Sequence, residues 1–212
     1  MTTELCAYTC DACDIARRTG VTRIELCAAP LEGGTTPSAG LIRYARRLPG
    51  LRLSVMIRPR GGDFIFNLIL VALMFSPHVT QIPNYMVVKT LGLIDTYWAL
   101  IVEEIRFARE CGADGVVFGL LTPEGEVDEA RTAQLVREAA GMEVTFHRAF
   151  DMASDPLRAL EAVVRTGCRR VLTSGGRNTA QEGLGTLRAL VAQAAGRIEI
   201  MAGSGVGPSN AR

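Results

Sequence analysis

The chain repeats one pattern of apolar and polar positions four times. In each copy, a stretch with helical periodicity ends at a glycine, and two or three mostly polar residues then lead into a short apolar run. Glycine suits the left-handed position that ends a helix. A helix, a glycine and a strand in repeated order are typical of parallel βα units. The four copies begin at Gly20 (GVTRIELC), Gly112 (GADGVVFG), Gly167 (GCRRVLTSG) and Gly196 (GRIEIMAGSG).

The same patterning places the remaining elements. Further strands are expected at 4–8, 51–57 and 143–147, and helices at 11–19, 37–48, 97–111, 128–140, 156–166 and 186–195. About seven strands, each ending in a polar or glycine-rich loop, predict a single α/β domain over residues 1–212: a (β/α)8 TIM-type barrel, a fold of ~250 residues. The alternative is an open doubly wound sheet, but no G-x-G-x-x-G motif follows the first strand.

One segment departs from this rhythm. Residues 64–75 carry no charge, and they directly follow the polar turn IRPRGGD. A membrane-spanning helix needs ~20 apolar residues, whereas this run is interrupted by Asn67 and ends at Ser76 and Pro77. We therefore favour an apolar insertion at about 67–94 over a membrane span.

Composition fits an ordinary soluble protein. The chain is 48% hydrophobic and 21% charged, with a net charge of +1, so nothing suggests a nucleic-acid partner. The N-terminus MTTELCAYTCDACD lacks the features of a signal peptide, and a cytoplasmic location is expected. The six cysteines should then be mostly reduced, and metal binding or packing is favoured over disulfides.

Strand alternation turns several polar side chains toward the barrel interior, near the strand ends where barrel enzymes place their sites. Burying charge is costly unless it is paired. The set therefore forms either a functional site or a structural Glu–Arg network. Its members are Glu4, Cys6, Glu25, Cys27, Arg58 and His147.

An enzyme is one hypothesis for this set. His147, Arg148 and Asp151 could supply a base, an anion clamp and an orienting carboxylate, with Glu4 and Glu25 as further acid or base candidates. The reaction would suit an isomerase, lyase or aldolase acting on an anionic small molecule.

Ligand-binding candidates lie in the loops. Arg58 and Arg60 could bind a carboxylate or phosphate, with Asp63 fixing their loop. The glycine-rich turns after the last strands suit phosphate-type sites of barrels, although such glycines are more often plain turns. The candidates in these turns are Ser174, Gly203 and Gly205.

Four long motifs strongly resemble the CutC family of copper homeostasis proteins. They are VTRIELCAAPLEGGTTPSAG, VMIRPRGGDF, VTFHRAFDM and RVLTSGG, and the resemblance covers residues 3–66 and about 96–210. It implies a (β/α)8 barrel that is cytosolic and often a homo-oligomer. It also implies Cu(I) bound by cysteine thiolates near the barrel mouth, with Cys6 and Cys27 at the matching positions.

The two cysteines also make physical sense as ligands. We expect them at the same level of adjacent parallel strands, ~4.8 Å apart, and soft thiolates select Cu(I). The alternative is that both are small core residues. Cys10 and Cys13 begin a helix, and no second pair completes a zinc site.

The chain departs from the family pattern in two places. Residues 67–94 have no family counterpart, and family members continue past GSGVGPSNAR with a final strand and helix. We therefore expect an incomplete barrel that lacks its last βα unit and is unstable or aggregating alone. The sequence as a whole predicts a copper homeostasis protein, with the enzyme as the alternative.

Overall fold

The computed structural model describes residues 3–59, 97–207 and 210. The expected insertion at about 67–94, together with Arg60 and Asp63, lies outside the described residues. The chain divides into two compact units, Met1–Ala113 and Asp114–Arg212. Of the helices in the described ranges, none is long and apolar enough to cross a membrane.

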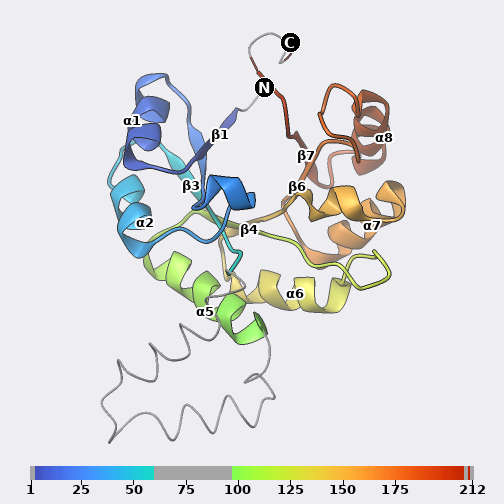
Figure 1. The fold of residues 1–212 in the computed structure, drawn as a ribbon. Helices are drawn as coiled ribbons and strands as arrows, with labels where there is room; N and C mark the ends of the chain where they lie inside the picture. Colours follow the sequence, from blue (N-terminus) through green and yellow to red (C-terminus); the bar gives the residue numbers. More distant parts are fainter. Residues whose placement is uncertain (1–2, 60–96, 208–209, 211–212) are drawn as a thin grey trace, which may run out of the picture. The chain divides into compact units, whose positions relative to one another are not determined.

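The first unit holds three parallel strands in the order β1-β2-β3. The register pairs Leu5 with Ile24 and Ile24 with Leu53, and in Figure 1 helices α1 and α2 lie to one side of these strands. The elements are β1 (Glu4–Ala7), α1 (Cys10–Arg18), β2 (Arg23–Leu26), η1 (Pro30–Glu32), α2 (Ala39–Arg46), β3 (Arg52–Met56) and α5 (Tyr97–Glu110).

The second unit holds four parallel strands in the order β4-β5-β6-β7. Helices α6, α7 and α8 follow one another along one side of them (Figure 1). The elements are β4 (Gly115–Phe118), α6 (Glu129–Glu138), β5 (Glu143–Phe146), η2 (Arg148–Met152), α7 (Pro156–Thr166), β6 (Arg170–Thr173), α8 (Leu184–Ala194) and β7 (Glu199–Ala202).

The helix ends follow the local sequence. Thr9 caps α1 by accepting a hydrogen bond from Ala12 N at 3.2 Å, and Asp155 caps α7, whose first residue is Pro156. The glycines of the repeated pattern all have positive φ, between 76° and 86°, which confirms why glycine stands there: Gly20, Gly112, Gly167 and Gly196.

Ion pairs built on a buried arginine join the beginnings of the strands in each unit. Arg23 Nε lies 2.9 Å from Glu4 Oε2, with both side chains at most 10% exposed. Arg170, only 3% exposed, lies 2.7 Å from Glu199 and also contacts Glu143. Of the inward-facing candidates, Glu4 therefore belongs to a structural ion pair with Arg23.

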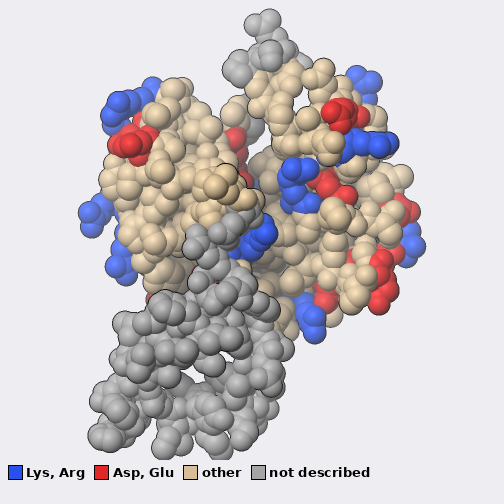
Figure 2. Space-filling view, viewed as in Figure 1, with Lys and Arg blue, Asp and Glu red and all other residues tan. Residues whose placement is uncertain are grey.

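Ion pairs also link neighbouring helices on the outer surface. Arg165 on α7 lies 2.7 Å from Glu129 on α6, and Arg197 lies 2.7 Å from Glu161 on α7. Figure 2 shows basic and acidic side chains interspersed over the second unit, on the right of the view. Exposed pairs of this kind contribute only about 0–1 kcal/mol each.

Candidate functional site

Two sulfur atoms meet at the end of β1 and β2. The Sγ atoms of Cys6 and Cys27 are 3.6 Å apart. The register differs from the expected one, because Cys6 lies opposite Glu25 and not opposite Cys27. Cys27 is two residues further along the chain, and side chains two apart on a strand share a face. The sulfurs therefore approach along a diagonal.

Glu25 completes a group of three donors. One ligand atom each from Cys6, Glu25 and Cys27 lies within 4.8 Å of the others, the one such group of three or more found in the described part of the chain. Glu25 is only 9% exposed, and its Oε1 atom is buried without a hydrogen-bond partner.

The surroundings of the two thiols shift their pKa values in opposite directions. A hydrogen bond from Cys27 lowers the pKa of Cys6 to about 7, against the opposing effect of burial, and a hydrogen bond from Tyr8 lowers it further. The hydrogen bond to Cys6 and burial both raise the pKa of Cys27. Cys6 is thus the thiol of the pair that ionises first, in the neutral pH range, and Cys27 keeps its proton to higher pH.

Burial also perturbs the carboxylate. It raises the pKa of Glu25 to about 8, and the nearby charges of Cys6 and Glu4 act in the same direction. Without a cation, Glu25 therefore stays largely protonated at neutral pH.

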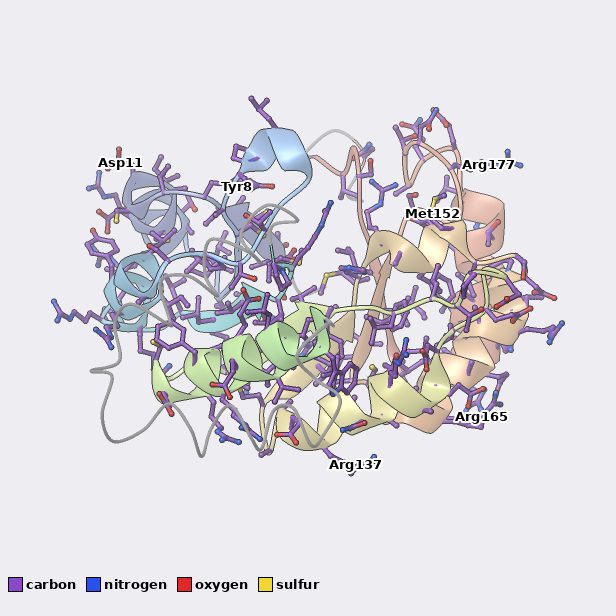
Figure 3. All side chains as sticks on the ribbon, turned by 60° about the horizontal axis from the view of Figure 1, so that its bottom comes forward. Tyr8, Asp11, Arg137, Met152, Arg165 and Arg177 are labelled. Atoms are coloured by element: carbon purple, nitrogen blue, oxygen red, sulfur yellow. The ribbon has the colours of Figure 1, made fainter. Side chains whose placement is uncertain are left out.

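Tyr8 is a site residue that sequence reasoning missed. It follows β1, two residues after Cys6 (Figure 3), and its hydroxyl hydrogen-bonds the Cys6 sulfur. Its spacing from Cys6, which turns both side chains to one face, was the available signal.

Arg58 fixes the loop that covers Cys27. Its Nη1 donates to the carbonyls of Gly33 and Gly34, both at 3.4 Å. Gly34 packs directly on Cys27, since a Cβ atom there would lie 3.5 Å from the sulfur. Arg58 therefore positions this loop, and its proposed role as an anion ligand stays a prediction.

In the second unit, Asp151 is a hub of hydrogen bonds. Its carboxylate accepts from Arg148 Nε at 2.9 Å, from the backbone N–H groups of Ser174 and Gly176 at 3.0 Å, and from the hydroxyls of Ser174 and Thr173. Burial acts to raise the pKa of Asp151, but these donors outweigh it and lower the pKa. The carboxylate therefore ties η2 to the loop after β6.

Side chains near Asp151 also make hydrogen bonds within the protein. Ser174 is fully buried, and its hydroxyl also accepts from Arg148 Nη2 at 3.0 Å. His147 caps η2, with Nδ1 accepting from Ala149 N at 3.2 Å, and it packs over Gly119, where a Cβ atom would lie 2.7 Å from Nδ1.

The late glycine-rich turn packs against the loop after β6. Gly203 N donates to Thr173 O at 2.9 Å, and a side chain at Gly203 would strike Leu172 at 2.6 Å. Gly205 has a φ of 71°, and its carbonyl accepts from the Asn210 side chain. The close contact at Gly203 and the positive φ of Gly205 each explain why glycine stands there. The role of the two residues in ligand binding stays a prediction.

A cavity of about 320 Å³ lies beside this hub. Asp151, Gly175, Gly176, Arg177 and Thr186 contribute to its lining. Arg177, on the loop between β6 and α8 (Figure 3), is exposed. It was not among the sequence candidates, because nothing in GGRN marks the arginine as lining a cavity.

The predicted site residues thus form two groups. Cys6, Glu25, Cys27 and Arg58 lie in the first unit, and His147, Arg148, Asp151, Ser174, Gly203 and Gly205 lie in the second. From the strand ends that carry them, we also expect Arg58, Arg60, His147 and Arg148 to share one pocket with Glu25, and this stays a prediction.

Comparisons with known proteins agree on one family. The CutC family model matches residues 1–93 and 72–212. A family protein CutC from Bacteroides thetaiotaomicron is 44% identical over 208 residues, covering 98% of this chain and 73% of that protein. One from Porphyromonas gingivalis is 44% identical over 206 residues, covering 97% and 72%.

Solved structures identify the fold. A structure named for the copper homeostasis protein CutC of Streptococcus agalactiae matches with a TM-score of 0.78 and 31% identity, covering 100% of this chain and 91% of that one. An aldolase matches with a TM-score of 0.60 at 12% identity, covering 97% and 80%, and this likeness concerns the fold alone. The expected TIM-barrel type with seven described strands is confirmed, and the chain belongs to the CutC family.

Proposed function

We propose that this CutC-family chain serves copper homeostasis by binding one Cu(I) ion between Cys6 and Cys27. The observation that carries the proposal is the 3.6 Å separation of the two sulfurs, which lets one ion touch both. Soft thiolates prefer Cu(I) to harder cations. The name of the similar Streptococcus agalactiae structure supports the same function.

The residues fit a transported ion. Cys6 is exposed and Cys27 is buried, so one sulfur faces solvent while the other anchors the ion. The lowered pKa of Cys6 supplies a thiolate near neutral pH, and Tyr8 can steady it by donating its hydroxyl hydrogen. Free thiols suit the reducing cytoplasm, where we place this activity. A homo-oligomer stays a prediction.

The geometry favours metal binding over the enzyme alternative. Asp151 and Ser174, two of the candidates for an anionic substrate, use their oxygens on donors and acceptors of the loop after β6. Near the thiol pair, by contrast, the Oε1 atom of Glu25 has no hydrogen-bond partner and is available as a metal ligand.

Titration of the reduced protein with Cu(I), in competition with a chromophoric Cu(I) chelator, tests the proposal. Wild type should take up about one ion, and the double variant Cys6→Ser/Cys27→Ser none. Cys10→Ser, which removes an exposed thiol at the start of α1, is the matched control and should bind as wild type does. Unchanged affinity in the double variant would overturn the proposal.

A further inference from the structure

Glu25 lacks a protein partner for one of its oxygens. Its Oε1 atom is buried without a hydrogen bond, and leaving such a group unsatisfied costs about 1–3 kcal/mol. Arg23, on the same strand, is bound to Glu4 at 2.9 Å. A buried and unsatisfied carboxylate oxygen beside two sulfurs is the arrangement that a cation would satisfy.

The sulfur spacing indicates how such a cation would be held. With metal–sulfur bonds of ~2.3 Å, a tetrahedral ion places two sulfurs ~3.8 Å apart, and a linear ion with equal bonds places them ~4.6 Å apart. The observed separation is 3.6 Å. It lies nearer the tetrahedral value, which leaves room for a third ligand, whereas a linear ion held by the two sulfurs alone requires them to move ~1 Å apart.

Charge favours a divalent ion when all three groups are ionised. Two thiolates and one carboxylate carry three negative charges, so a divalent ion leaves one and a monovalent ion leaves two. Because uncompensated buried charge is costly, the divalent ion is the better match. Cysteine and carboxylate are both established zinc ligands, and zinc sites with three protein ligands keep a fourth position open.

We infer that Cys6, Cys27 and Glu25 bind a divalent thiophilic cation of the Zn(II) class, with Glu25 as the third ligand and the fourth position open. The inference rests on the proposed function for the two cysteines as metal ligands. Glu25 then determines which cation is held: divalent ions need its carboxylate, whereas Cu(I) binds through the thiolates.

Cd(II) and Zn(II) titrations of the reduced, metal-free full chain test this inference. Cd(II) binding is read from thiolate-to-metal charge-transfer absorption, and Zn(II) binding from competition with a chromophoric chelator. Glu25→Gln should weaken both by at least about 100-fold, the upper end of what losing an outer-shell partner costs. Its Cu(I) affinity should stay within a factor of about three, well under one tenfold step.

Glu4→Gln is the matched control, because it removes a nearby negative charge that is committed to Arg23. If it weakens Cd(II) binding as much as Glu25→Gln does, the effect is long-range charge and ligation by Glu25 is refuted. X-ray absorption of the Zn(II)-loaded wild type needs no variant. It should show two sulfur ligands at ~2.3 Å with oxygen at ~2.0–2.2 Å, and a shell without oxygen would overturn the inference.

The outcomes also separate the two proposals. Wild type that binds Cd(II) through both cysteines and Glu25 but does not bind Cu(I) would sink the copper function and leave the inference standing. Wild type that binds Cu(I) but neither divalent ion would do the reverse. Circular dichroism of each variant checks that the fold is intact.

Discussion

Replacing Asp151 with asparagine should destabilise the protein although it preserves the size of the side chain. The carboxylate only accepts hydrogen bonds, and donors surround both of its oxygens. Thr173 and Gly176 donate to Oδ1, Arg148 and the Ser174 hydroxyl donate to Oδ2, and the Ser174 backbone N–H is shared by both. An amide must place its own N–H₂ group against one of these sets.

The magnitude follows from the number of donors left without an acceptor. The amide nitrogen fits better on the Oδ2 side, where the Ser174 hydroxyl can rotate, but the N–H of Arg148 then loses its charged partner. A lost hydrogen bond to a charged group costs about 1.5–3 kcal/mol, and an unsatisfied buried donor about 1–3 kcal/mol. Because Arg148 is 45% exposed, water replaces part of what it loses. We expect a total near 2 kcal/mol, which lowers the melting temperature by about 4–8 °C in a protein of this size.

Thermal and urea unfolding followed by circular dichroism measure the effect. Asp155→Asn is the matched control, because Asp155 caps α7 and asparagine caps helices about as well. The lowered pKa of Asp151 also sets a pH dependence. Its stabilisation is present above the unfolded pKa of about 3.9 and is lost as the pH falls through the lower folded value. An Asp151→Asn melting temperature no lower than that of the control would refute the reasoning.

Two other substitutions probe the same physics elsewhere. In metal-free, reduced protein, Glu25→Gln should gain stability over wild type as the pH rises from about 4.5 to 8. The raised pKa of Glu25 makes wild type lose stability through that window, by at most about 1.4 kcal/mol per pH unit; parallel pH profiles of unfolding would contradict this. Gly183→Ala should destabilise by about 1–3 kcal/mol, because its Cβ would lie 1.9 Å from Ser174 O. Gly185→Ala, in open space near the start of α8, should be neutral or gain up to about 1 kcal/mol, and the reverse order of melting temperatures would count against the packing described.

The sequence was sufficient for the features that depend on local periodicity. The glycine after each helix predicted a positive φ, and the alternation along β2 correctly predicted that Glu25 and Cys27 share one face. The position of Cys27 along β2 relative to Cys6 on β1 could not be predicted from the sequence, because it depends on the register in which the two strands pair. The sequence favoured a catalytic role for Asp151 because its hydrogen-bond donors could not be inferred locally. Those donors are Thr173, Ser174 and Gly176, which lie more than twenty residues later in the chain.

For the proposed metal site, the unequal exposure of the two sulfurs predicts a direction of loading. Cys27 is 1% exposed, whereas Cys6 is exposed and has the lower pKa. An ion delivered on a small thiol or a donor protein must therefore meet Cys6 first, and only afterwards exchange its remaining carrier ligand for Cys27. Such stepwise exchange never releases a free ion, so the rate of delivery should depend on the carrier concentration and on Cys6 more than on Cys27.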